Sequence, residues 1–363
     1  MVVGVGITVT VALFALSGGD APGGGLDVAP DSERVLGAGK GAPSSAEDEG
    51  AVARPVDSVR RVRRSLRREL QAGARRAATL GGSVHAAAML SGWEAPVVAA
   101  SDPADADRAM RLWSTSKVLT AVALLREAAW DDRPGERLSP EVEEALTGAL
   151  VRSENCRQRR VVLELQEATG SPEQARSELA AIVASAGADI ALGSEVERPQ
   201  PICRPFLETQ RATADPMAPA LLLGTSTWTM ADAVHFANAL ASGRYGDAVG
   251  NRVLDLMRRP KQPSRETPPG DYTAALDWGA GRALAGFDPA FKAGWGGTLI
   301  DDFFVSQMVV LDLPDGGTAS LAIAFHPNVQ PSKDDPGLTP GPDAVEVVVQ
   351  AVGDELGRLG LGG

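Results

Sequence analysis

Cysteine and histidine are scarce in this chain of 363 residues. Its two cysteines exclude a disulfide-framework protein and a cysteine-rich zinc module. The three histidines, His85, His235 and His326, stand at no metal-ligand spacing, and no Gly-x-Ser-x-Gly elbow supports a Ser-His-Asp triad. The sequence therefore predicts no metal, and it suggests no nucleotide or other cofactor.

Lysine is also rare, since five of the 35 basic residues are lysines and the other 30 are arginines. Acidic residues outnumber basic ones, and the formal net charge of -12 argues against general nucleic-acid binding. The length suits one large domain or two modest ones with a substantial apolar core.

An apolar run over residues 2–16 lies near the start of the sequence. About 15 residues is short for a membrane span and suits the core of a signal peptide, although the usual preceding basic residues are missing. We interpret 1–17 as a signal peptide or signal anchor, with a buried element of the fold as the alternative. Residues 18–54, rich in Gly, Ala, Pro and acidic residues, cannot bury enough apolar surface to fold and predict a disordered linker. We expect an exported protein, extracellular or anchored to the outer face of the cytoplasmic membrane, that touches the membrane only through its N-terminal segment.

Residues 55–363 have the pattern of one α/β (α+β) domain. Short apolar segments at 83–90 and 96–100 predict a hairpin, and 303–313 and 318–325 predict two more strands. Helical patterns fill much of the chain between these strand pairs, and a last helix is expected at 343–359. Strands from both ends of the chain, with helices between them, predict an antiparallel sheet flanked by helices beside an all-helical lobe of about 115–275.

Residues 55–79 combine a helical apolar stripe with many arginines. The arginine face is either a solvated surface, which we favour, or a contact with an anionic envelope surface.

Ser114 and Lys117 form a Ser-x-x-Lys pattern at the start of an apolar run, 118–125. A serine before such a run is typical of a helix N-terminus, and residues three apart share one helix face. The lysine amine can then reach the serine hydroxyl, and burial or a second cation can hold that amine neutral, as a base must be. The pattern predicts a nucleophile beside its base, with a solvated lysine as the alternative.

Two further motifs follow in order, Ser153-Glu154-Asn155 and Lys292-Ala293-Gly294. The ordered triple resembles the penicillin-recognising serine hydrolases, most closely the class A β-lactamases, whose motifs are Ser-x-x-Lys, Ser-Asp-Asn and Lys-Thr-Gly. The similarity extends over roughly 55–359 and implies the serine β-lactamase-like (DD-peptidase-like) fold.

The resemblance implies catalytic roles for three matched residues. Ser114 would be the acylated nucleophile, and Lys117 would be its activating base. Ser153 would relay a proton to the leaving nitrogen.

The resemblance also implies which residues bind the substrate, a β-lactam or a peptidoglycan-like peptide. Asn155 would hold its amide, and Lys292 would supply positive charge near its carboxylate, with Gly294 beside it in the same motif. The backbone N–H groups of Ser114 and Trp295 would form the oxyanion hole.

The departures from the family pattern bear on turnover. Glu154 stands for the usual aspartate, and Ala293 replaces a threonine whose hydroxyl helps hold the substrate carboxylate, so the binding of ordinary penicillins is an open question. Glu195 is the candidate for the deacylating glutamate, but the residues that follow it do not complete the family's Glu-x-Glu-Leu-Asn pattern. Without that glutamate the acyl-enzyme would be long-lived.

Three functions stay open from the sequence. We favour a monomeric, exported acyl-serine hydrolase that acts on a β-lactam or on a related amide or peptide of the cell envelope. The alternatives are a non-catalytic envelope binding or regulatory protein on the same fold, and an esterase that uses Ser114 and Lys117.

The two cysteines are Cys156, directly after the second motif, and Cys203, in the irregular segment that also contains Glu195. In an exported protein they can form a disulfide that ties this segment to the second motif. Two reduced, buried cysteines are the other possibility.

Overall fold

The structure is a computed structural model that describes residues 56–128, 132, 138–192, 226–259, 261, 278–296, 304–329 and 340–362, without the side chains of residues 56, 57 and 295. The chain divides into two units, Met1–Ala53 and Arg54–Gly363, and every described element belongs to the second. The predicted signal segment 1–17 and linker 18–54 lie outside the described residues and stay predictions.

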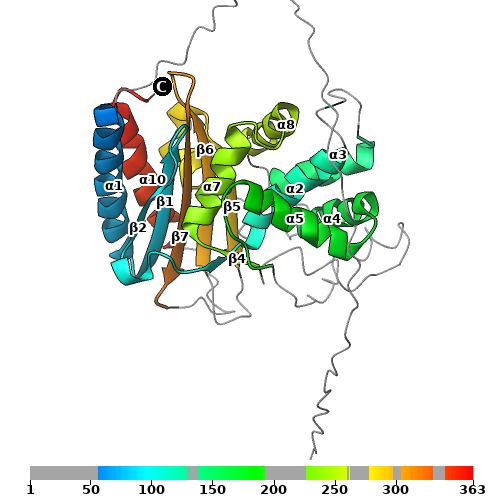
Figure 1. Ribbon diagram of the computed structural model, residues 1–363. Coiled ribbons are helices and arrows are strands. Elements are labelled where there is room, and N and C mark those ends of the chain that lie inside the picture. The colour runs from blue at the N-terminus through cyan, green and yellow to red at the C-terminus, as the bar shows by residue number, and fades with distance from the viewer. Residues whose placement is uncertain are drawn as a thin grey trace, which may run out of the picture. The chain divides into compact units, whose positions relative to one another are not determined.

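A five-stranded antiparallel sheet forms the centre of the second unit (Figure 1). The strands, in spatial order, are β2 (Val97–Ala100), β1 (Gly82–Leu90), β7 (Thr318–Pro327), β6 (Phe304–Asp312) and β5 (Ala290–Gly296). The hairpin β1–β2 and the strands β6 and β7 are confirmed close to their predicted bounds. Because β1 pairs with β7, the first and last strands that were expected from the sequence meet in the middle of the sheet.

Both faces of the sheet are covered, and the strand residues are therefore buried almost without interruption. Helices α1 (Val56–Ala78) and α10 (Gly341–Arg358) pack against each other and against one face, on the left of Figure 1. Helix α7 (Met230–Ala241) packs on β1, β6 and β7 from the other side. Successive strand residues point to opposite faces, so Ala88 contributes to the core under α1 and α10, whereas Met89 contributes to the core shared with the other helices.

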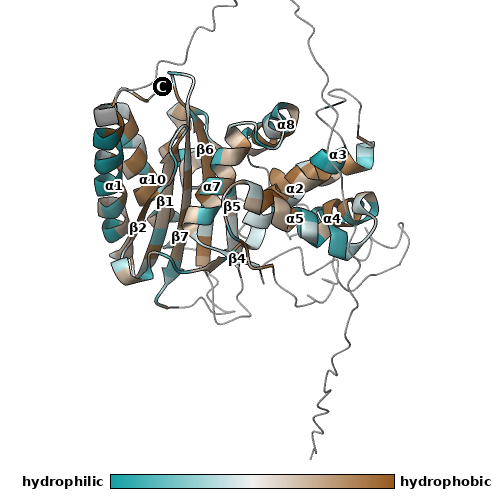
Figure 2. Cartoon of the chain, viewed as in Figure 1, coloured by the Kyte–Doolittle hydropathy of each residue, from teal (hydrophilic) through white to brown (hydrophobic). Residues whose placement is uncertain are grey.

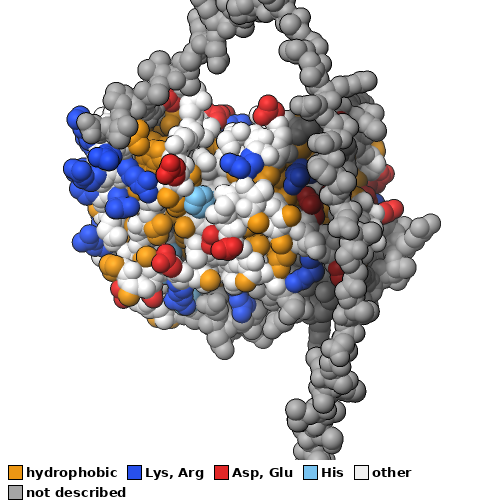
Figure 3. Space-filling view, viewed as in Figure 1, with side chains coloured by type: hydrophobic (Ala, Val, Ile, Leu, Met, Phe, Trp, Pro, Cys, Tyr) orange, Lys and Arg blue, Asp and Glu red, His pale blue; other side chains and the backbone are white. Residues whose placement is uncertain are grey.

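Helix α1 is amphipathic in the way its sequence predicts. Leu66, Leu70 and Ala74 are buried, while the arginines point outward and gather as a blue surface on the left of Figure 3. Figure 2 shows the same division as a teal outer side on α1 and brown strands beneath it. Burial of the apolar stripe is enough to fix the helix; the solvated arginine face stays the favoured prediction, and contact with an anionic surface stays the alternative.

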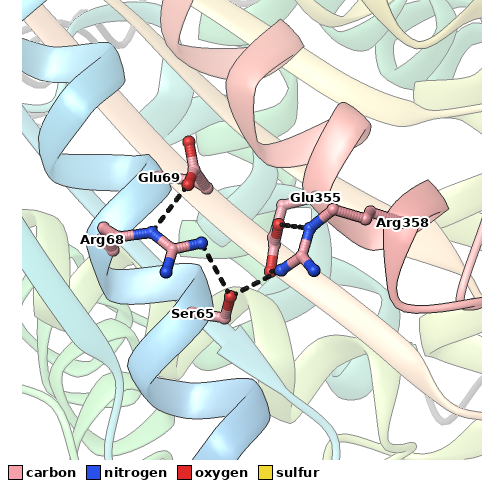
Figure 4. A network of polar contacts seen from close by, with 5 residues as sticks. All are labelled: Ser65, Arg68, Glu69, Glu355 and Arg358. Atoms are coloured by element: carbon pink, nitrogen blue, oxygen red, sulfur yellow. Dashed lines mark hydrogen bonds and ion pairs between the residues drawn. The ribbon is translucent and has the colours of Figure 1, made fainter.

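A polar network ties α1 to α10 (Figure 4). Ser65 accepts hydrogen bonds from Arg68 at 3.3 Å and from Arg358 at 2.7 Å, and Arg358 also pairs with Glu355 at 2.5 Å. Ser65 and Glu355 are buried, so these bonds satisfy polar groups that the helix interface removes from water.

The helical lobe contains five helices among the described residues. They are α2 (Ser116–Glu127), α3 (Pro140–Leu150), α4 (Asn155–Thr169), α5 (Pro172–Ser185) and α8 (Asp247–Arg258). Helices α4 and α5 are separate, because Gly170 ends α4 with a φ of 87° and Ser171 caps α5 through the amide of Gln174.

Short elements complete the described part of the chain. They are η1 (Pro103–Asp105), β3 (Met110–Arg111), η2 (Trp113–Thr115), β4 (Thr227–Trp228), α9 (Ala280–Ala283) and η6 (Ala285–Phe287). Strand β3 pairs with β4 in a separate two-stranded ribbon that leads directly into η2. Across the described segments, no helix combines the length and apolar character needed to cross a membrane.

Candidate active site

Ser114 lies in the 3₁₀ turn η2 immediately before α2, rather than acting as the cap of that helix. Trp113 has a φ of 44°, and Thr115 stands at the N-cap position of α2 without a side-chain capping bond. The expected common face is nevertheless present, because Lys117 Nζ lies 3.1 Å from Ser114 Oγ. Ser114 is 9% exposed and Lys117 is fully buried, so the solvated-lysine alternative is excluded.

Ser153, in the turn between α3 and α4, and Asn155, the first residue of α4, meet Lys117. Ser153 adopts a φ of 55°, a left-handed conformation that costs a non-glycine residue about 1 kcal/mol or more. Lys117 Nζ lies 2.6 Å from the Ser153 carbonyl oxygen, 2.8 Å from Asn155 Oδ1 and 3.3 Å from Ser153 Oγ. The first two motifs therefore join around a single lysine.

Glu154, the middle residue of the second motif, belongs to a buried ion-pair network. Its carboxylate accepts a hydrogen bond from Arg152 at 2.9 Å, and Arg152 also pairs with Glu144 at 2.6 Å. The Glu154 amide donates to the Gly148 carbonyl oxygen at 2.9 Å. Glu154 thus holds the turn in place, and neighbouring Ser153 and Asn155 are left to face the site.

Lys292 reaches the same turn from β5, the edge strand of the sheet. Its Nζ lies 2.8 Å from Ser153 Oγ and donates to the Ala293 carbonyl oxygen at 2.6 Å. Ser153 Oγ therefore lies between two lysine amines. Burial holds the pKa of Lys292 well below its usual 10.5, and a proton on nearby Lys117 or Lys261 lowers it further.

Glycine allows β5 to approach the nucleophile closely. A Cβ atom on Gly294 would lie 3.3 Å from the Ser114 amide nitrogen, and a Cβ on Gly296 would lie 1.6 Å from the Trp113 ring. The backbone of Trp295 stands between these glycines in β5, and its side chain is outside the described residues. Ala293 points to the opposite face, where its methyl group joins the core under α1 and α10.

Two predicted features fall wholly or partly outside the described residues. Glu195 is outside them, so its proposed deacylating role stays a prediction. Cys156 is disulfide-bonded, as the bridge hypothesis requires; Cys203, the other cysteine in the sequence, is also outside the described residues.

The residues that are described contain no group of three or more His, Cys, Asp or Glu side chains able to hold a metal ion.

Lys261, which no motif marks, also lies beside these groups. It lines a narrow pocket together with Ser153, Lys292 and Ala293. The rarity of lysine in the sequence is the only signal that could have singled it out.

Comparison with known proteins supports the fold. No protein family and no curated protein matches the sequence. Among solved structures, a class A β-lactamase representative from Bacteroides cellulosilyticus is similar at 14% identity and a TM-score of 0.51, over 82% of this chain and 99% of that one. An ancestral class A β-lactamase (81% and 99% covered) and a β-lactamase from Desulfarculus baarsii (81% and 98% covered) are each 18% identical with TM-scores of 0.47. The predicted fold class is confirmed: the chain has a class A β-lactamase-like fold.

Proposed function

We propose that this protein is an exported acyl-serine hydrolase in which Ser114 attacks a carbonyl carbon and Lys117 accepts its proton. The observation that carries the proposal is the surroundings of the Lys117 amine. Within the part of the chain that the structure describes, its closest acceptors are two carbonyl-type oxygens, on Ser153 and Asn155, that can only accept hydrogen bonds. A neutral amine has two N–H groups for these oxygens and keeps one lone pair for the Ser114 hydroxyl, 3.1 Å away.

Burial favours this neutral form of Lys117. The side chain is fully buried, and desolvation disfavours a charged ammonium. Ser153 Oγ lies near the amines of both Lys117 and Lys292. If both amines were protonated, the two ammonium groups would repel each other across this oxygen. The arrangement suits a base better than a solvated cation.

The acylation step conserves atoms and charge. Ser114 Oγ forms a bond to the carbonyl carbon while its proton passes to Lys117. When the C–N bond of the substrate breaks, the proton on Lys117 reaches the leaving nitrogen through the Ser153 hydroxyl. Ser153 Oγ lies 3.3 Å from Lys117 Nζ. The oxyanion would be held by the backbone N–H groups of Ser114 and Trp295.

The remaining site residues suit substrate binding. Asn155 Oδ1 accepts from Lys117, so its NH₂ group is oriented to donate to an amide carbonyl of the substrate. Lys292 and the backbone around Gly294 line the β5 side, where a substrate carboxylate would meet positive charge. We propose a β-lactam or a related cell-envelope amide or peptide as substrate, with the family motifs and the shared fold as support.

Intact-mass spectrometry of the folded protein after incubation with a penicillin and with a fluorophosphonate tests the proposal. A covalent adduct is expected on the wild type and on Ser177→Ala, an exposed helix serine that serves as a control, but not on Ser114→Ala. Lys117→Ala should slow adduct formation about 10²- to 10⁴-fold, the usual contribution of a general base.

The remaining outcomes separate the alternatives. An adduct that persists on Ser114→Ala would refute the assignment of the nucleophile. If neither reagent labels folded wild type, the chain is a binding protein on a hydrolase fold. If activated esters are hydrolysed while the penicillin leaves no adduct and is not consumed, the esterase alternative holds. A persistent adduct would show that no efficient deacylating group is present, whereas a short-lived one would justify testing Glu195→Gln.

A further inference from the structure

Lys261 is held next to the proposed site by two specific contacts. Its Nζ donates to the Met257 carbonyl oxygen at the end of α8 at 2.7 Å, and it lies 4.6 Å from the centre of the Phe291 ring. Phe291 precedes Lys292 on β5, and Lys261 and Lys292 line the same narrow pocket. Three of the five lysines in the chain are therefore gathered around Ser153.

No described carboxylate offsets the charges of Lys261 and Lys292. Among the charged side chains of the packed elements, Arg252 of α8 pairs with Glu143, and Arg258 of α8 pairs with Asp255 of the same helix and with Asp312 of β6. In the turn before α4, both Glu144 and Glu154 pair with Arg152. On the η2 side, the Arg111 guanidinium, also a cation, lies 5.9 Å from the centre of the Trp113 ring.

Burial and mutual repulsion limit how many protons this cluster can bind. Desolvation lowers the pKa of Lys261 from 10.5 to about 7. The pKa of Lys292 is lowered well below 10.5, mainly by desolvation and then by Lys117 and Lys261. Of this pair, Lys261 has the better site for a cation, because its carbonyl partner is accompanied by the face of an aromatic ring, which also stabilises an ammonium group.

We propose that Lys261 is a positioning residue that acts through Lys292: it binds the first proton taken up by the pair, and its positive charge keeps the Lys292 amine neutral. A neutral Lys292 can give one N–H to the Ala293 carbonyl oxygen and accept the Ser153 hydroxyl proton in a hydrogen bond. A protonated Lys292 has no lone pair and can only donate to Ser153. Lys261 thereby sets the direction of the hydrogen bond at the serine that would relay the proton.

The electrostatic part of the proposal can be tested without any activity. With only five lysines, ¹³Cε-lysine labelling of the full chain gives five NMR resonances, which lysine-to-arginine substitutions assign. Lys261→Met should raise the titration midpoint of Lys292 by about one pH unit or more, the usual size of a close charge effect. Lys261→Arg keeps the charge and should leave the midpoint at or below the wild-type value. Arg259→Met removes an exposed cation two residues away and should leave it unchanged.

The catalytic part rests on the proposed function and is tested by the pH dependence of Ser114 acylation. Lys261→Met should move the acidic limb of the rate profile to higher pH, with rescue by Lys261→Arg. A role in packing alone would lower the rate at every pH without moving the limb. An unchanged Lys292 midpoint in folded Lys261→Met overturns the proposal even if Ser114 is acylated. If Ser114 is never acylated, the proposed function fails while the NMR titration still decides what Lys261 does to Lys292.

Discussion

Replacing Gly296 with alanine should displace the nucleophile without touching any group that reacts. The new Cβ would lie 1.6 Å from Cε2 of Trp113 and 2.0 Å from two further ring atoms. Because carbon atoms pack at about 3.5–4.0 Å, the ring must retreat by roughly 2 Å. Trp113 is buried against Phe304 at a centroid distance of 6.2 Å, so it has little room to do so without moving the backbone of η2.

This geometry gives both a stability effect and a rate effect. Overpacking of this kind costs about 1–3 kcal/mol, which a urea titration measures. Trp113 directly precedes Ser114, and a misplacement of about 1 Å can slow a reaction about 100-fold, so adduct formation in Gly296→Ala should be slower by at least that factor. The rate is measured by intact mass at substrate concentrations that saturate the wild type.

A matched control and a rescue variant separate this effect from general damage. Gly286→Ala adds a methyl group where no atom lies within 4 Å, and it should change neither stability nor rate. Trp113→Leu in the Gly296→Ala background frees space and should recover part of the lost stability. Wild-type acylation by a folded Gly296→Ala protein would refute the argument that the contact between Trp113 and Gly296 sets the position of Ser114.

Three further predictions concern stability. Glu154→Gln removes one charged partner of buried Arg152 and should lower the free energy of unfolding in urea by about 3 kcal/mol. This value is at the low end for a broken buried ion pair because Glu144 still pairs with Arg152. A loss below about 0.5 kcal/mol would show that the network does not hold the turn. Burial lowers the pKa of His85 below 6.5, so as the pH falls the unfolded state binds a proton before the folded state does. The free energy of unfolding should therefore fall by up to about 1.4 kcal/mol for each pH unit below 6.5. This slope should shrink in His85→Gln, measured by urea midpoints at pH 8 and 5.5. Cys156→Ala should lose about 2–4 kcal/mol and, unlike the wild type, should not respond to a reducing agent.

The sequence was most informative where function depends on local spacing. Ser114 and Lys117 are three residues apart, and their contact follows from helical geometry alone. Ser153 and Lys292 are 139 residues apart, and only the resemblance to a known ordered set of motifs predicted that they would share one site.

Two parts of the site could not be predicted from local patterns. The segment that forms β5 contains Gly294 and Gly296, and glycine weakens the β-strand signal; the structure uses these glycines for the close approach to η2. Lys261 was missed because a third cation beside two lysines is unfavourable on simple electrostatic grounds. Its position depends on where α8 ends against Phe291, which is a tertiary contact.

Arg152 and Lys292, two buried basic residues at the site, differ in whether a counter-charge lies beside them. Arginine stays protonated at any accessible pH, and buried Arg152 is accompanied by two carboxylates. Lysine can lose its proton, and Lys292, which is only 2% exposed, has hydroxyl and carbonyl partners but no described carboxylate. An arginine at position 292 would remain a cation in a place that burial makes unfavourable for one. The rare lysines of the site are therefore best explained by a need for amines that can be neutral, and this is the property that proton transfer from Ser114 requires.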